Sequence, residues 1–295
     1  MEQSSINIVD AISSTINNLF SNLFSSIDNN LYNVLDDLLF INTDILNDSI
    51  FKKIFGSSSI NGMLLICNSL ILGFVLYYLI SLLLSHITFS QVQKPTGFIF
   101  KLIIIIIFVN FSYFICEKII YLIQIISLSI REIGENIFGT NICLSSFIEK
   151  LNLSINTENS TFNIFTIDGL IKSFSSFSLI NLALSYSLRY IILKTFLLLT
   201  PFAILSLCLQ STSWFFKSWL KILLSLLFMQ ILVSIILLIG FSISNSSNDL
   251  FSKFLSVGTL YALTRANTFI KEFMGGLSTD ISIGIGSLKS FISGG

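Results

Sequence analysis

Long stretches without charge dominate the chain. No Asp, Glu, Lys or Arg occurs between Lys194 and Lys217, or between Lys221 and Asp249. Each gap exceeds the roughly 20 apolar residues that a helix needs to cross the hydrocarbon layer of a membrane. The link between the gaps is short, and lipid offers backbone polar groups no partners, so only antiparallel helices fit. Residues 187–244 therefore predict a transmembrane hairpin, helices 3 and 4.

Two further transmembrane helices are predicted in residues 56–133. The first covers Ile60–Leu84, which carries no charge, and the second begins near Phe98. Glu117 and Lys118 make the end of the second helix ambiguous. Either the helix leaves the membrane before this pair and projects onward, or the pair lies inside the membrane as an ionic functional site. The projecting helix is favoured because charge inside a membrane is costly.

Residues 1–55 predict an amphipathic helical arm, which is either continuous or interrupted at Asn17-Asn18 and Asn29-Asn30. Seven acids precede the first base, Lys52, whereas helices that lie on lipid usually carry Lys and Arg. Packing on a partner protein is therefore favoured over packing on lipid. The arm shows apolar residues at the helical spacing of three or four: Ile12, Ile16, Leu19, Leu23, Ile27, Leu31, Val34 and Leu38.

Two regions fall outside the predicted spans. Residues 134–186 form a long extracytoplasmic loop, in which Leu144–Leu151 and Leu170–Leu184 could each form a helix. Residues 245–295 hold a weaker apolar segment, Leu250–Leu263, and a Gly-rich tail. That segment is either a short fifth crossing or an interfacial helix. The predicted fold class is all-α: a polytopic membrane protein with four to five transmembrane helices, an N-terminal amphipathic helix and a long extracytoplasmic loop.

The hairpin contains the candidate functional residues. Arg189 and Lys194 are placed where helix 3 enters the membrane, as candidates for ionic or interhelix contacts. Thr200 and Pro201 lie inside helix 3, where proline removes a backbone hydrogen bond and kinks the helix. The kink is either a packing bend or a gate on a translocation path. Gln230 is the only strongly polar residue of helix 4, and we expect it to bond to another helix.

The ends of the predicted helices suggest an orientation. The connectors at 86–97 and 210–219 carry bases and no acid, which places both in the cytoplasm and the N-terminus outside. The second connector begins an interfacial belt of aromatic and basic residues: Trp214, Trp219, Lys217 and Lys221.

Composition supports the membrane class. Of the 295 residues, 53% are hydrophobic and 11% are charged, against about a quarter charged in soluble domains. The net charge is zero, which gives no basic field for stable binding of nucleic acid. The four cysteines have no CxxC spacing and there is one histidine, so no zinc site is expected. Catalytic and nucleotide-binding motifs are absent from the sequence, and we expect neither an enzyme nor a cofactor.

Two functions of different class fit these features. One is an assembly subunit that builds part of a translocation pore, and the other is a small-solute transporter or channel acting alone. A transporter usually shows internal repeats and paired broken helices. Here the first and fourth spans differ in polar pattern and one span is broken, which favours the assembly subunit.

Residues 180–280 contain a set of short motifs: Arg189-Tyr190, Thr200-Pro201-Phe202-Ala203, Trp214, Lys217-Ser218-Trp219-Leu220-Lys221, Gln230, Leu260-Tyr261-Ala262-Leu263, Ala266-Asn267-Thr268-Phe269-Ile270 and Gly275-Gly276. Together these motifs resemble the polytopic inner-membrane subunit of type IV secretion and conjugation systems, the TrbL-type family. The chain departs from longer members of the family, which carry a hydrophilic tail after the last span.

The resemblance implies a non-enzymatic, multi-pass subunit of a bacterial cytoplasmic membrane. Such a subunit forms homo-oligomers that line or scaffold a path for DNA or protein. Its partners would be membrane lipid, other channel subunits and transfer ATPases. Contact with DNA would be transient. Affinity for phosphate grows with each Lys or Arg engaged, and this chain has no excess of basic residues.

Overall fold

Helices make up all the regular structure among the described residues of the computed structural model, which are 2–56, 62–88, 94–155, 163–245 and 249–274. Two single-turn 3₁₀ segments, η1 and η2, lie between α9 and α10. The elements in order are α1 (Glu2–Leu39), α2 (Asp44–Asn47), α3 (Ser49–Phe55), α4 (Met63–Thr88), α5 (Pro95–Asn110), α6 (Ser112–Phe138), α7 (Leu144–Ile155), α8 (Ile167–Leu198), α9 (Thr200–Leu205), η1 (Ser206–Cys208), η2 (Gln210–Thr212), α10 (Ser213–Ser244) and α11 (Leu250–Met274).

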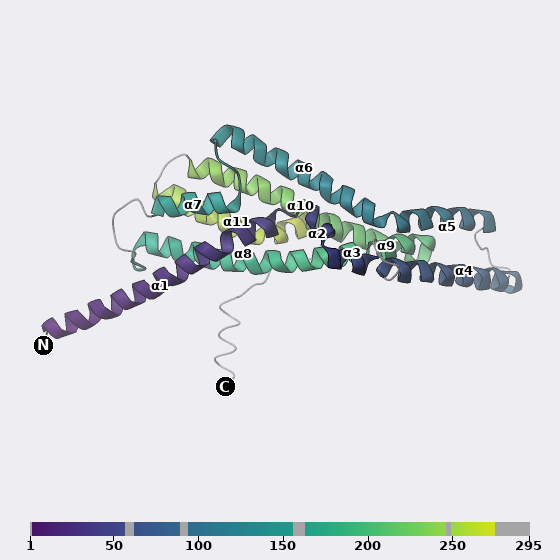
Figure 1. Cartoon of the computed structure of the whole chain (residues 1–295), viewed down its shortest axis with the longest axis horizontal. Coiled ribbons are helices and arrows are strands. Elements are labelled where there is room, and N and C mark those ends of the chain that lie inside the picture. The colour runs from purple at the N-terminus through teal and green to yellow at the C-terminus, as the bar shows by residue number, and fades with distance from the viewer. Residues whose placement is uncertain (1, 57–61, 89–93, 156–162, 246–248, 275–295) are drawn as a thin grey trace.

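The helices form an elongated bundle (Figure 1). Helices α4 and α5 form one end, while α7 and the first turns of α8 lie at the other. Three hydrophobic clusters follow one another between these ends. The first joins α1, α7, α8, α10 and α11 around Phe147 and Leu263, the second joins α3, α6, α8 and α10 around Phe55 and Leu223, and the third joins α4, α5 and α9 around Val109.

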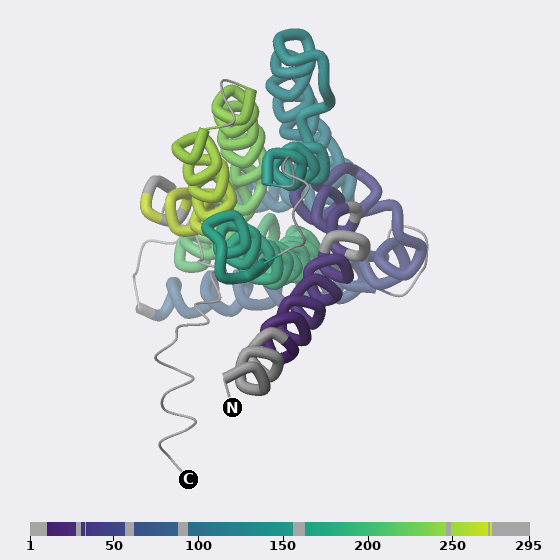
Figure 2. Tube along the Cα trace, turned by 90° about the vertical axis from the view of Figure 1, so that its left-hand side faces the viewer, coloured from purple at the N-terminus to yellow at the C-terminus, as the bar shows by residue number. Residues whose placement is uncertain are grey.

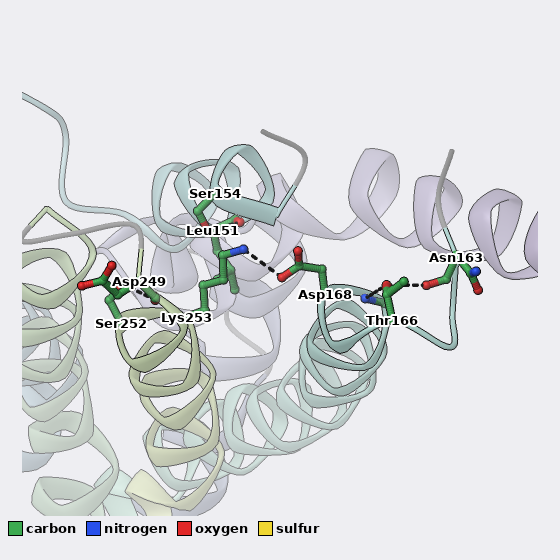
Figure 3. A network of polar contacts seen from close by, with 9 residues as sticks. Leu151, Ser154, Asn163, Thr166, Asp168, Asp249, Ser252 and Lys253 are labelled. Carbon is green, nitrogen blue, oxygen red and sulfur yellow. Dashed lines mark hydrogen bonds and ion pairs between the residues drawn. The ribbon is translucent and has the colours of Figure 1, made fainter. Parts of the chain in front are cut away.

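A polar network fastens the α7 end of the bundle (Figure 3). The Lys253 ammonium of α11 forms an ion pair with the Asp168 carboxylate in the first turn of α8, at 2.8 Å. The Thr166 hydroxyl caps the same helix by accepting a hydrogen bond from the Gly169 N–H at 3.1 Å. A carboxylate in the first turn also meets the positive end of the helix dipole. These contacts fix where α8 begins.

Among the described residues, four helical segments are long and apolar enough to cross a membrane, which is compatible with the predicted class. They are Met63–Ile87, Ser112–Phe138, Ile167–Leu198 and Gln210–Ser244. Helix α5 is apolar but has only 16 residues. Side chains on the outside of α4 and α5, such as Leu72 and Phe100, are about two-thirds exposed. These surfaces suit a lipid environment.

The helices of the structure differ in their bounds from several of the predicted segments. The second predicted span is divided between α5 and α6 at Phe111, whose backbone angles (φ −88°, ψ 3°) lie outside the regular helical range. Most of residues 134–186 is helical, since α7 and the first 20 residues of α8 lie there. Helix α1 runs without a break through Asn17-Asn18 and Asn29-Asn30. The predicted boundaries at 133–134 and 186–187 therefore fall inside α6 and α8.

Helix α11 contains the fifth apolar segment that the sequence predicts, Leu250–Leu263. It is continuous, does not qualify as a candidate span and buries Leu260, Leu263 and Ala266 against the other helices. Gly240 lets α10 and α11 approach closely, since a Cβ there would lie 2.6 Å from the Thr259 Cγ2. The Gly-rich tail after Met274 lies outside the described residues.

Candidate functional site

Arg189 of α8 is the largest side chain that is fully enclosed by the protein. Its Nε donates to the Leu226 carbonyl oxygen at 3.0 Å, and its Nη1 donates to the Leu39 carbonyl oxygen at 3.3 Å. The guanidinium lies 5.6 Å from the Tyr186 ring centroid. Leu39 is the last residue of α1, where the helix dipole is negative and favours a cation. Arg189 thus joins α1, α8 and α10.

A polar cavity of about 400 Å³ lies close to this junction, between α1, α6 and α10. Gln230 of α10 is 2% exposed, and its Oε1 has no partner among the described residues. Gln124 of α6 also lines the cavity and has an unpaired Oε1. The hydrogen bond between α6 and α10 at this level joins Ser127 and Ser234, at 2.7 Å. Gln230 therefore faces the cavity, and the interhelix bond predicted for it is made by serines.

Two charged residues bind the turn that closes the cavity. The Asp36 carboxylate of α1 accepts hydrogen bonds from the backbone N–H groups of Leu144 and Ser145, at the start of α7. Arg131 of α6 donates its Nε to the Ile142 carbonyl oxygen at 2.7 Å. Both side chains line the cavity. Its wall therefore offers opposite charges, amides and hydroxyls, which suit water or a small polar solute.

The proline break is packed inside the protein. Helix α8 ends at Leu198 and α9 begins at Thr200, with Pro201 in its first turn. The Trp219 indole N–H donates to the Phe196 carbonyl oxygen at 2.9 Å. Thr200 and Pro201 are buried, and the Thr200 Oγ1 lies 3.1 Å from the Cys116 Sγ of α6. Trp219 is 3% exposed, so its assignment to the interfacial belt is corrected: it stabilises the break.

The remaining candidates lie on the outside of the bundle. Glu117 and Lys118 form a pair at 3.7 Å on the outer face of α6, with both side chains at least a third exposed. Lys194 binds Asp48 at 3.3 Å and so joins α8 to α3. The exposed belt residues of α10 are Trp214, Lys217 and Lys221.

Sequence reasoning missed Asp36, Gln124 and Arg131. Asp36 and Arg131 bind the turn before α7, which lies near them only in the folded chain. Gln124, Ser127 and Arg131 lie on one face of α6 at helical spacing, and this polar stripe on an apolar helix is a signal that could have been used.

No group of three or more His, Cys, Asp or Glu within the described ranges could hold a metal ion. All four cysteines are free and buried. Comparison of the chain with models of protein families, with curated proteins and with solved structures found no match. The likeness to the TrbL-type family therefore stays a prediction, and function has to be argued from geometry.

Proposed function

We propose that this chain is a membrane subunit of a bacterial translocation channel of the type IV secretion or conjugation kind. In this proposal it oligomerises, and it scaffolds or lines a path for DNA or protein together with other channel subunits and transfer ATPases. The observation that carries the proposal is the position of α1, whose apolar face is left uncovered in the single chain.

The N-terminal part of α1 extends past the other helices (Figure 1), and along the long axis it lies to one side of them (Figure 2). The C-terminal part packs on α7 and α8, where Leu35 and Leu39 are fully buried. Farther toward the N-terminus, Ile12, Leu19 and Leu23 are at least half exposed. An exposed apolar stripe of this kind favours a protein partner, and the same stripe on another copy would match it.

The N-out orientation in this proposal follows the connectors at 86–97 and 210–219, which carry bases and no acid. Lys94, Lys101 and Lys217 belong to the end of the bundle formed by α4, α5 and the start of α10, which we assign to the cytoplasmic side. Helix α1 and the turn before α7 then lie toward the outside. In this arrangement the α1 helices of neighbouring copies would pack beside the path. The hairpin of residues 187–244 would anchor the subunit in the membrane, and the bend at Pro201 would lie within that hairpin.

Oligomeric state in detergent tests the proposal. We expect the protein to run as a large complex and the Leu19→Glu, Leu23→Glu double variant to run as a monomer, because charge on the stripe opposes packing. The matched control is Asn18→Glu, Asn22→Glu, which adds the same charge beside the stripe and should leave the complex intact. A wild-type monomer would overturn the proposal.

The polar cavity favours a second candidate, a small-solute transporter or channel that acts alone. Its wall includes residues of α6 and Gln230 of α10, and both helices qualify as membrane spans. Purified protein in liposomes distinguishes the two candidates. Solute flux by a monomer, lost on Gln230→Leu, supports the transporter, whereas a large complex without flux supports the channel subunit.

A further inference from the structure

An apolar groove of about 300 Å³ opens on the side of the bundle where α5 meets α6, α9 and α10. Every residue that lines it is aliphatic or aromatic, and the wall includes Ile105, Phe108, Ile115, Leu207, Phe216 and Trp219. The indole N–H of Trp219 is already bonded to the Phe196 carbonyl oxygen, so the ring presents only hydrocarbon to the groove. Water would find no hydrogen-bond partner there, and the groove suits a hydrocarbon chain.

Two helical interruptions lie beside the groove. The break at Phe111 turns α6 away from α5, and the short α9 with η1 forms a floor between α5 and α10. Phe108 is half exposed and Trp219 is nearly buried, so the groove is open on one side and deep on the other.

Basic residues border the groove without a counter-charge. Lys101 lies one turn before Ile104 and Ile105, on the face of α5 that lines the groove, and about 9 Å along the helix from Pro95. Lys217 directly follows Phe216 and is exposed. Within the described residues neither lysine forms an ion pair.

One acid lies among the segments that line the groove: Glu117, between Ile115 and Ile119, is paired with Lys118 at 3.7 Å. Residues 95–116 and 199–248, which contain α5, the first turn of α6, α9 and α10, include no Asp or Glu. A Lys placed this far along a helix that faces lipid requires an anion or must extend to the interface. The combination of a hydrocarbon-lined groove and unpaired ammonium groups matches the two parts of a phospholipid.

We propose that this groove binds an anionic glycerophospholipid, with an acyl chain in the groove and the phosphate at Lys101 and Lys217. A zwitterionic phospholipid offers the same hydrocarbon but its own positive charge opposes the lysines. The proposal depends on membrane insertion of α5 and α10, but not on a role in translocation. Loss of the channel hypothesis would leave it unaffected.

Tryptophan fluorescence gives a direct test, because the chain has two tryptophans and one of them lines the groove. The Trp214→Phe variant leaves Trp219 as the single fluorophore. It is reconstituted into phosphatidylcholine vesicles that contain a fixed fraction of either phosphatidylglycerol or phosphatidylcholine with brominated acyl chains. We expect brominated phosphatidylglycerol to quench Trp219 more strongly than brominated phosphatidylcholine at the same mole fraction.

Lysine variants in the Trp214→Phe background test the charge requirement. Each lysine near an anionic lipid surface contributes about fivefold to binding, so Lys101→Gln with Lys217→Gln should lower the preference on the order of twentyfold. Lys150→Gln, on α7 at the other end of the bundle, is the control and should keep the preference. Added salt should also weaken it without any mutation. Equal quenching by the two brominated lipids, or a preference that survives in the double variant, would overturn the proposal.

Discussion

The Asp36 carboxylate accepts a hydrogen bond from the backbone N–H of Leu144 at 2.8 Å, across 108 positions of the chain. The bond joins the last turns of α1 to the first turn of α7 and satisfies an N–H that the helix itself leaves unpaired. The bond is a long-range equivalent of an N-cap. It holds the buried C-terminal end of α1, whereas the apolar face near the N-terminal end of α1 is exposed.

Replacing Asp36 should loosen the arm. Asp36→Ala is expected to cost about 1 kcal/mol of stability, the usual value of a lost N-cap. Thermal unfolding in detergent measures the change, and limited proteolysis should cut α1 faster. Asp37→Ala is the control, because Asp37 is exposed and makes no such bond to α7. Equal losses in the two variants would contradict a capping role for Asp36.

Arg189 should be the most sensitive charged position. Arg189→Ala is expected to cost about 3 kcal/mol, since it opens a cavity and leaves the Leu39 carbonyl without its donor. Arg189→Met keeps most of the volume and should cost about 1 kcal/mol. Lys194→Met, on the same helix but partly exposed, should lose less than 1 kcal/mol. Chemical denaturation of the three variants gives the order, and a harmless Arg189→Ala would refute the proposed junction.

The two tryptophans should respond differently to the same substitution. Trp219→Phe removes the donor to the Phe196 carbonyl beside the proline break and should cost about 2 kcal/mol. Trp214 is 65% exposed, and Trp214→Phe should stay within about 0.5 kcal/mol of wild type. Thermal stability in one detergent measures both. If Trp219 served the membrane interface instead, the two variants would behave alike.

Glycines 240 and 73 form a matched pair for packing. A Cβ at Gly240 would lie 2.6 Å from the Thr259 Cγ2 and 3.0 Å from the Phe147 Cε2, so Gly240→Ala should cost about 1–3 kcal/mol through overpacking. No atom lies within 4 Å of a Cβ at Gly73, and Gly73→Ala should raise stability by up to about 1 kcal/mol through helix propensity. Denaturation midpoints should therefore move in opposite directions.

Asp48 should contribute a pH dependence at low pH. The pKa of its carboxyl is lowered from 3.8, first by the hydrogen bond from the Ile50 N–H and then by the bond to Lys194. A lowered folded-state pKa means that this stabilisation is complete above about pH 4 and is lost as the pH falls through the folded value. Unfolding measured between pH 6 and pH 2.5 should show a smaller decline for Asp48→Asn than for wild type.

The sequence predicted the helical class and the apolar segments because membrane crossing imposes a length and a composition that can be counted. It also located the interruption at Pro201, since proline acts locally. It did not place Trp219 inside the protein, because its partner is a carbonyl on another helix. The junction at Arg189 escaped prediction for the same reason, as Leu39 lies 150 positions away. Local sequence patterns predict individual helices, whereas buried polar contacts between helices form only in the assembled bundle.

Helix α10 supplies side chains to all three hydrophobic clusters, from Phe216 near α5 to Phe241 beside α7. It spans about 48 Å at 1.5 Å per residue without a break. A tilt or axial shift of α10 would therefore disturb the packing of all three clusters at once. A force applied at one end of α10 would be transmitted to the other end.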